Sequence, residues 1–242
     1  MPNLKLLKVK SEIALRKMGN KFGVDVKMTD EEIFLKQLNF NNINLIFDVG
    51  ANTGQFGELI YKMGYIGDIV SFEPLSSAYN ILKKRANNFK AWTIAERCAI
   101  GDFDGETKIN ISENSISSSV LNILNEHTSA APGSKYVGTE TVQSHKLDTI
   151  GHNFIKNQDN IFLKIDTQGF ESKILDGATE FIKGVKGMLI ETSLVKLYEG
   201  QALFPDIYER ALNAGFKLWG IQPAFVNKKS GRLLQADLVF FR

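Results

Sequence analysis

Residues 43–64 place the strongest constraint on how this chain can fold. Ile43–Val49 is a short apolar run that ends at Gly50, as a buried parallel strand does. Gly50 and Gly54 allow a tight turn there. An apolar series at helical spacing follows and stops at Gly64, namely Phe56, Leu59, Ile60 and Met63. The segment therefore predicts a strand, a glycine loop and a helix, with free amide N–H groups where the helix begins.

The alternation of strand and helix recurs along the chain. Further strands are predicted over residues 68–72, 92–100, 161–166 and 188–192, and helices over 77–86, 170–181 and 205–214. Residues 216–221 and 238–241 flank a turn and predict an antiparallel pair. Residues 108–111 predict an added strand, and 110–138 a long loop with one short helix. We expect a doubly wound α/β fold with a mostly parallel sheet and an antiparallel C-terminal hairpin.

Charge is unevenly distributed, although the net charge is only +2. Residues 1–27 hold seven basic and two acidic side chains, which leaves the remaining residues slightly acidic. A nucleic-acid-binding protein should instead carry a basic face on its main fold, so we expect no nucleic-acid partner. With 242 residues the chain is long enough for one large domain or two small ones. Its 43% of hydrophobic residues is ordinary for a globular enzyme.

The basic N-terminal segment predicts an amphipathic helix that ends near Gly19 or Gly23, and a second short helix is expected after Thr29 or Asp30. We expect residues 1–42 to be a helical extension and 43–242 the main domain. The basic helix can lie on a membrane surface, grip an acidic substrate, or dock on the domain or on a partner subunit of a homo-oligomer. The sequence has no apolar run of spanning length, no secretory signal and one cysteine, Cys98, which favours a cytoplasmic protein.

The glycine loop has an acidic partner, Glu73, at the end of the next strand. A carboxylate there can accept hydrogen bonds from both hydroxyls of a ribose. Asn52 stands where a dinucleotide loop has its second glycine, and Asp48 would bring a negative charge near a diphosphate. S-adenosylmethionine has a ribose and an ammonium but no phosphate, so it suits these residues better than NAD. An NAD-dependent oxidoreductase stays open, as does a purely structural role for Asp48 as a helix cap.

Several runs of the sequence, in this order, resemble the FkbM-type methyltransferase family. They are Ile46-Phe-Asp-Val-Gly-Ala-Asn-Thr-Gly54, Ser71-Phe-Glu-Pro74, Ala99-Ile-Gly-Asp102, Leu147-Asp148 and Leu163-Lys-Ile-Asp-Thr-Gln-Gly-Phe-Glu171. The resemblance spans about residues 43–195 and departs from the family pattern at Thr167-Gln168, where Val-Glu is more frequent. It implies a class I S-adenosylmethionine-dependent fold and O-methylation of a sugar, glycan or secondary-metabolite hydroxyl.

The resemblance also implies a set of cofactor-binding residues. Asp48 is expected near the methionyl part, Glu73 at the ribose, and Cys98 and Ala99 beside the adenine. The other residues expected at the cofactor are Gly50, Ala51, Asn52, Gly54, Pro74 and Ser119. Ser117–Ser119 resembles a serine-rich family segment, which could bind cofactor or acceptor, or form a simple turn.

Acidic residues are expected to converge at the chemical end of the site. Asp48, Asp166 and Glu191 each close a strand, and in an open α/β sheet the ligand lies at the carboxyl ends of the strands. Asp166 is the first candidate for the general base and Glu191 the second, with Lys164 as counter-cation or as a strand-end lysine whose ammonium reaches solvent.

Two alternatives for the chemistry, and one for the function, stay open. A divalent metal held by Asp166 and Glu191 is the first. The second is a histidine base, for which His145 and His127 rank ahead of His152. A catalytically silent domain that binds cofactor or a partner is the remaining functional reading.

Overall fold

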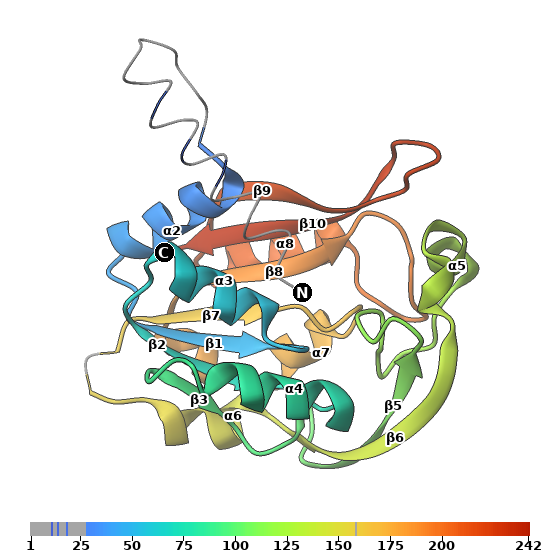
Figure 1. Ribbon diagram of the computed structural model, residues 1–242, viewed down its shortest axis with the longest axis horizontal. Coiled ribbons are helices and arrows are strands. Elements are labelled where there is room, and N and C mark those ends of the chain that lie inside the picture. Colours follow the sequence, from blue (N-terminus) through green and yellow to red (C-terminus); the bar gives the residue numbers. More distant parts are fainter. Residues whose placement is uncertain (1–10, 12–13, 15–17, 19–27, 158) are drawn as a thin grey trace.

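The computed structural model describes residues 11, 14, 18, 28–157 and 159–242. It contains a seven-stranded sheet with the order β3-β2-β1-β7-β8-β10-β9 (Figure 1). The strands are β1 (Leu45–Val49), β2 (Asp68–Phe72), β3 (Trp92–Ile94), β7 (Ile161–Ile165), β8 (Val185–Ser193), β9 (Lys217–Val226) and β10 (Leu233–Phe241). The first five are parallel, and β10 runs antiparallel to both β8 and β9. The predicted doubly wound sheet with an antiparallel C-terminal hairpin is confirmed.

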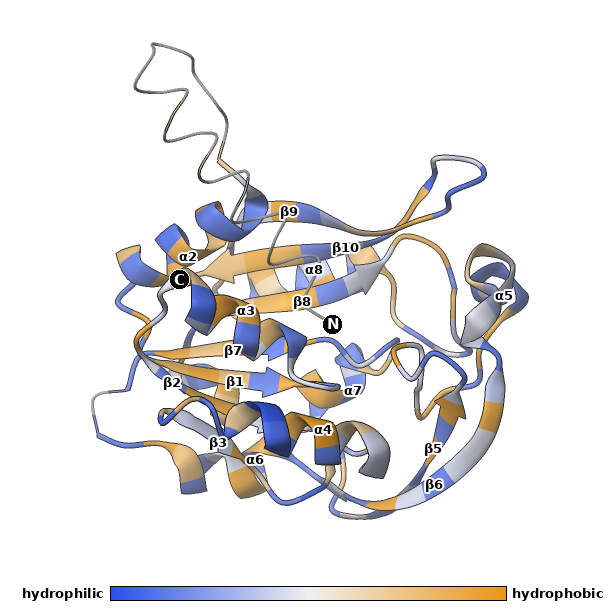
Figure 2. Cartoon of the chain, in the orientation of Figure 1, coloured by the Kyte–Doolittle hydropathy of each residue, from blue (hydrophilic) through white to orange (hydrophobic). Residues whose placement is uncertain are grey.

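Helices cover both faces of the sheet. One face carries α2 (Asp30–Phe40), α3 (Gln55–Met63) and α4 (Ser76–Ala86). The other carries α6 (Leu147–Ile150), α7 (Glu171–Asp176) and α8 (Phe204–Asn213), with the 3₁₀ turns η2 (Gly151–Phe154) and η3 (Phe181–Gly184) beside them. Figure 2 shows apolar residues concentrated in the central strands between these layers. Side chains alternate between the two faces of a strand, so successive residues of β1 enter different cores.

The second helix expected from the sequence is α2. Thr29 caps it, because its hydroxyl accepts from the Glu32 amide while the Glu32 carboxylate accepts from the Thr29 amide. Phe34 and Leu38 enter the same core as α3, which fixes α2 on the domain. The division of the chain at residue 42 stays a prediction. The amphipathic helix expected in residues 1–27 falls outside the described residues, apart from three isolated positions.

The predicted third strand, 92–100, is wrong as one element. It divides into β3, in the main sheet, and β4 (Ala99–Ile100), in a second sheet with the order β4-β6-β5. Arg97, at the bend between them, donates to the Pro74 carbonyl and to the Glu140 carboxylate. The chain therefore leaves the main sheet after Ile94 and enters a smaller one.

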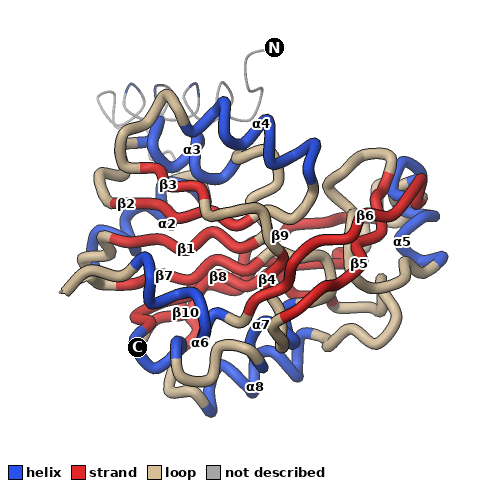
Figure 3. Tube along the Cα trace, turned by 90° about the horizontal axis from the view of Figure 1, so that it is seen from below, coloured by secondary structure: helices blue, strands red, loops and turns tan. Residues whose placement is uncertain are grey.

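The small sheet stands at the carboxyl ends of the parallel strands (Figure 3). It contains β5 (Gly105–Ser112), which is longer than the predicted strand 108–111, and β6 (Tyr136–His145), whose first residues lie in the predicted loop 110–138. Between them lie α5 (Asn125–Ala130) and η1 (Pro132–Ser134), in the segment predicted to be mostly loop. No helix among the described residues is long and apolar enough to cross a membrane.

Candidate functional site

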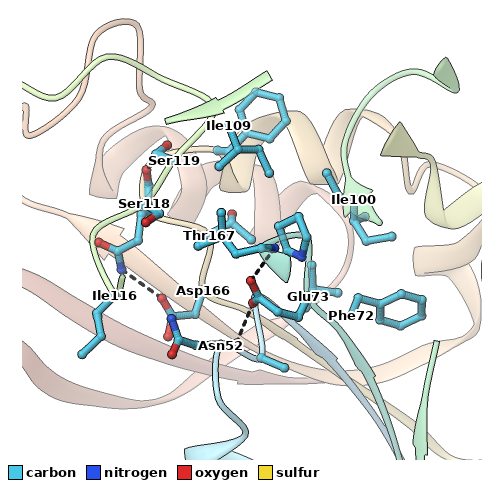
Figure 4. Close-up of a pocket in the computed structure, with 18 of the residues that line it drawn as sticks. Asn52, Phe72, Glu73, Ile100, Ile109, Ile116, Ser118, Ser119, Asp166 and Thr167 are labelled. Carbon is cyan, nitrogen blue, oxygen red and sulfur yellow. Dashed lines mark hydrogen bonds between the residues drawn. The ribbon is translucent and has the colours of Figure 1, made fainter. Parts of the chain in front are cut away.

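A cavity of about 420 Å³ lies at the carboxyl ends of β1, β2 and β7, a size typical of small-molecule sites. The glycine loop forms one wall and the small sheet another (Figure 4). Most of the residues expected from the sequence at the cofactor line this cavity: Gly50, Ala51, Asn52, Glu73, Pro74, Cys98, Ala99 and Ser119. Asp166 and Lys164, from the predicted chemical end, line it too.

The glycine loop takes its shape from a close approach to β7. Gly50 has φ +76°, and a Cβ there would lie 1.9 Å from the carbonyl oxygen of Asp166. The amides of Gly50 and Ala51 both donate to the Phe72 carbonyl, which fixes the turn against β2. A residue with a side chain at position 50 would push the loop away from β7, so glycine is required there.

Glu73 is buried beside the loop, and both carboxylate oxygens have backbone partners. Oε2 accepts from the Asn52 amide at 2.7 Å and Oε1 from the Leu75 amide at 2.9 Å (Figure 4). Burial raises the pKa of Glu73 to about 7, although these hydrogen bonds act to lower it. Each oxygen keeps further acceptor capacity, so the ionised carboxylate can receive the two hydroxyls of a diol.

Next to Glu73 the lining is apolar. It comprises Phe72, Leu75, Cys98, Ala99, Ile100, Ile109 and Val120. Burial raises the pKa of the Cys98 thiol to about 12, so this cysteine acts as a small apolar residue and not as a nucleophile. A nucleoside fits such a site, because the carboxylate can accept hydrogen bonds from its ribose hydroxyls and the neighbouring apolar slot can hold its base.

Asp48 lies differently from the prediction. It is fully buried under the glycine loop, outside the cavity lining, where Oδ1 is 3.0 Å from Lys164 Nζ and Oδ2 accepts from the Ser71 hydroxyl at 3.0 Å. Trp92 Nε1 donates to the same hydroxyl. The carboxylate is therefore used to hold Lys164. Burial lowers the pKa of Lys164, but the charges of Asp48 and Asp166 outweigh this and leave it raised.

The expected convergence of acidic residues is present, with Gln168 between them. Gln168 Nε2 is 3.0 Å from Asp166 Oδ1 and 2.8 Å from Glu191 Oε2. Asp166 faces the cavity, whereas Glu191 lies behind it, outside the lining. Burial, followed by the charge of Asp166, raises the pKa of Glu191 well above its ordinary value. Asp166 is thus the better placed of the two predicted bases.

A metal at this position has no support from the geometry. Among the described residues no group of three or more His, Cys, Asp or Glu side chains is arranged to hold an ion. The Gln168 amide and the Lys164 ammonium, which are donors and not metal ligands, occupy the space beside Asp166.

Two other predicted residues lie away from the cavity. Gly54 begins α3 with φ +84°, and a Cβ there would meet Leu82 at 2.7 Å, so this glycine serves helix packing. His145, at the end of β6, is outside the cavity lining, with Nδ1 3.5 Å from Asp104 Oδ1. The position of His145 speaks against its predicted role as base.

The remaining histidines are also outside the lining. His127 is buried against the rings of Tyr198 and Phe225, and burial lowers its pKa to about 4. His152 packs near Phe181.

Sequence reasoning missed several residues of the site. Asp237, in β10, lines the cavity and is a charged residue within an otherwise mostly apolar strand, which could have identified it. Ser115 and Ile116 line it next to Ser118 and Ser119 of the predicted serine-rich segment. The Ser119 hydroxyl accepts a hydrogen bond from the Leu121 amide and donates one to the Gln168 carbonyl oxygen. The bond to Leu121 forms the simple serine turn that was one of the expectations from the sequence.

Strand order and cavity together define a doubly wound α/β fold with a cavity at the carboxyl ends of its parallel strands. The sequence matches the model of the methyltransferase FkbM domain over residues 48–218. Since this is more than half of the chain, the protein belongs to the FkbM methyltransferase family. No curated protein sequence matches it.

Solved structures with a related fold include other methyltransferases. Magnesium protoporphyrin IX methyltransferase from Synechocystis PCC 6803, with bound S-adenosylhomocysteine, has a TM-score of 0.49 and 7% identity, covering 88% of this chain and 81% of that one. A TehB-like S-adenosylmethionine-dependent methyltransferase from Corynebacterium glutamicum has a TM-score of 0.42 and 12% identity, covering 98% of both chains. Precorrin-6y C5,15-methyltransferase from Geobacter metallireducens has a TM-score of 0.44 and 10% identity, covering 88% and 86%.

Proposed function

We propose that this protein transfers the methyl group of S-adenosylmethionine to a hydroxyl group of a small molecule or glycan. One observation supports the proposal most directly. One cavity is lined by two sets of residues: the Glu73 carboxylate with the glycine loop and an apolar slot, and Asp166 with Lys164. The first set of residues suits a nucleoside, and the second suits the removal of a proton.

The cavity residues divide the work of binding. Glu73 receives the ribose hydroxyls, and the slot formed around Ile100 and Ile109 takes the adenine. The methionyl part extends past Gly50 toward Lys164. When bound, S-adenosylmethionine supplies an electrophilic methyl group.

Asp166 performs the acid–base part of the reaction. Its carboxylate would accept the proton that the acceptor hydroxyl loses as the oxygen bonds to the methyl carbon and the bond from that carbon to the sulfonium sulfur breaks, with S-adenosylhomocysteine as the leaving group. Lys164 Nζ lies 3.6 Å from Asp166 Oδ2 and so contacts the carboxylate oxygen on that side. Alignment of acceptor and methyl by the walls of the cavity supplies the rest of the acceleration.

Isothermal titration calorimetry with S-adenosylmethionine tests the cofactor assignment. Glu73→Ala should weaken binding strongly, whereas Glu209→Ala, on the exposed face of α8, should leave it unchanged. A folded wild-type protein that gives no binding heat and no protection against thermal unfolding would refute the assignment.

Transfer of a labelled methyl group, screened over sugars, glycolipids and polyketide alcohols, tests the O-methylation. Each reaction is run with and without EDTA. Product labelled on oxygen supports the proposal, and label found only on nitrogen or carbon contradicts it. Activity that survives EDTA removes the metal alternative.

A further inference from the structure

Gln168 is a buried polar side chain whose place in the site neither the sequence nor the proposed reaction explains. It follows β7 in the turn 166–171 and has a left-handed backbone, with φ +58°. A non-glycine residue adopts this conformation at a cost, which the surrounding structure must offset. The turn is held by the Glu171 carboxylate, whose Oε1 accepts from the amides of Thr167 and Gly169.

The side-chain amide of Gln168 contacts three side chains. Nε2 donates to Asp166 Oδ1 at 3.0 Å and to Glu191 Oε2 at 2.8 Å. Oε1 lies 3.1 Å from the hydroxyl of Tyr198, whose single proton is shared between Oε1 and the Ser117 carbonyl oxygen, also at 3.1 Å. Rotation of the amide by half a turn would place its oxygen against two carboxylates, so the carboxylates and Tyr198 together fix one orientation.

Asp166 is consequently restrained from two sides. Gln168 holds Oδ1, and the Lys164 ammonium lies 3.6 Å from Oδ2. The Asp166 side chain is still 37% exposed, toward the cavity. The carboxylate that faces the acceptor therefore has a fixed direction, which a base needs in order to meet the hydroxyl proton.

Residue 168 is more often glutamate in the family pattern, so this chain places a neutral donor where a carboxylate is more frequent. Lys164 is the cation that faces Asp166 within the described part of the site, and four carboxylates surround the pair: Asp48, Glu171, Glu191 and Asp237. Gln168 brings two N–H donors to Asp166 and Glu191 without adding charge. A carboxylate at 168 would have nearly the same shape but would add a negative charge where two carboxylates already lie.

We propose that Gln168 is the positioning residue of the transfer reaction: its amide holds Asp166 in the orientation that accepts the proton and separates it from Glu191. The proposal rests on the proposed function, in which Asp166 is the base. It assigns no contact between Gln168 and the methyl group itself.

Two substitutions separate positioning from binding. Gln168→Leu removes both N–H donors. Gln168→Glu keeps the shape of the side chain but replaces the donor to Asp166 with a carboxylate oxygen, which repels it. We expect Gln168→Leu to lower kcat by about 10- to 100-fold while KM for S-adenosylmethionine changes less than about twofold. Gln168→Glu should move the acidic limb of the kcat–pH profile upward by about one pH unit or more, because a like charge raises the pKa of a carboxylate.

Gln143→Glu is the matched control. Gln143 is exposed on β6 and also donates to a carboxylate, that of Glu106, so the variant makes the same chemical change in solvent. Its kcat and pH profile should equal those of the wild type. An unchanged pH profile and kcat in both folded Gln168 variants would overturn the proposal, as would a loss confined to KM.

These kinetic outcomes decide the positioning role. Failure of the wild type to bind S-adenosylmethionine refutes the proposed function instead.

Discussion

The buried carboxylate of Glu73 makes the stability of this protein depend on pH in a way that can be measured. Burial raises the pKa of Glu73 from 4.5 to about 7. The fold therefore favours the protonated carboxyl, so the stabilising contribution of Glu73 is complete below pH 4.5 and is lost as the pH rises through about 7. The substitution Glu73→Gln removes this ionisation while nearly keeping the shape of the side chain.

The size of the effect follows from the pKa of Glu73 in the unfolded and the folded chain. A tenfold difference in proton affinity between the two states corresponds to about 1.36 kcal/mol. A change in pKa from 4.5 to about 7 is then about 3 kcal/mol of unfolding free energy. Relative to Glu73→Gln, the wild type should lose about 3 kcal/mol between about pH 4 and about pH 8. Glutamine also leaves the Asn52 or the Leu75 amide without an acceptor, but that cost does not vary with pH.

Urea unfolding of cofactor-free protein, repeated across this pH range, measures the difference between wild type and Glu73→Gln. Glu209→Gln, on the exposed face of α8, serves as the control and should track the wild type. A difference that stays constant within about 0.5 kcal/mol would show that Glu73 ionises normally and would refute the reasoning.

Cofactor binding gives the same ionisation a second readout. In the proposed complex the ribose hydroxyls donate to the charged carboxylate, which should lower the pKa of Glu73. Affinity for S-adenosylhomocysteine should fall by up to about tenfold per pH unit below pH 7, with proton uptake on release of the ligand. Glu73→Gln should bind weakly with little dependence on pH.

Three further substitutions test other parts of the structure. Gly50→Ala should abolish folding or cofactor binding, since its Cβ would meet a backbone carbonyl at 1.9 Å. The control is Gly200→Ala, with φ +69° but nothing within 4 Å, which should lower the unfolding free energy measured in urea by only about 1 kcal/mol. Lys164→Met should destabilise the fold by about 3–5 kcal/mol, because it leaves the buried Asp48 carboxylate without its cation, and a loss under about 1 kcal/mol would contradict the ion pair. His145→Ala should keep kcat within about threefold of wild type, since the residue lies outside the cavity; a drop of about 100-fold would restore it as a base.

Local pattern was enough to predict much of the fold. The strand, loop and helix of residues 45–63 combine an apolar run, a glycine turn and helical spacing within about twenty residues, and each is a property of neighbours in the chain. The third strand was predicted wrongly for the complementary reason. Residues 92–100 all suit a strand, and the bend at Arg97 depends on Pro74 and Glu140, which come from distant parts of the sequence.

The site also contains residues that local pattern predicts and residues whose place depends on tertiary contacts. Gly50, Asn52 and Glu73 were identified because loop and strand end lie at fixed positions in a parallel sheet. The role of Asp48 was not identified, because the sequence cannot show that Lys164 lies beside it on the neighbouring strand and forms an ion pair with it. His145 suited a base by chemistry alone, but the small sheet carries it away from the cavity.

The sequence by itself determined the class of fold, the family and the glycine loop with its acidic partner, since spacing along one strand and one turn carries that information. Only the tertiary structure decided which of the two predicted bases, Asp166 and Glu191, faces the cavity. Asp166 directly follows β7, and Glu191 lies near the end of the neighbouring β8. What distinguishes them is contact across the sheet: Gln168 and Lys164 hold Asp166 open to the cavity, and Glu191 lies behind it. Such contacts join residues far apart in the chain, so no local pattern encodes them.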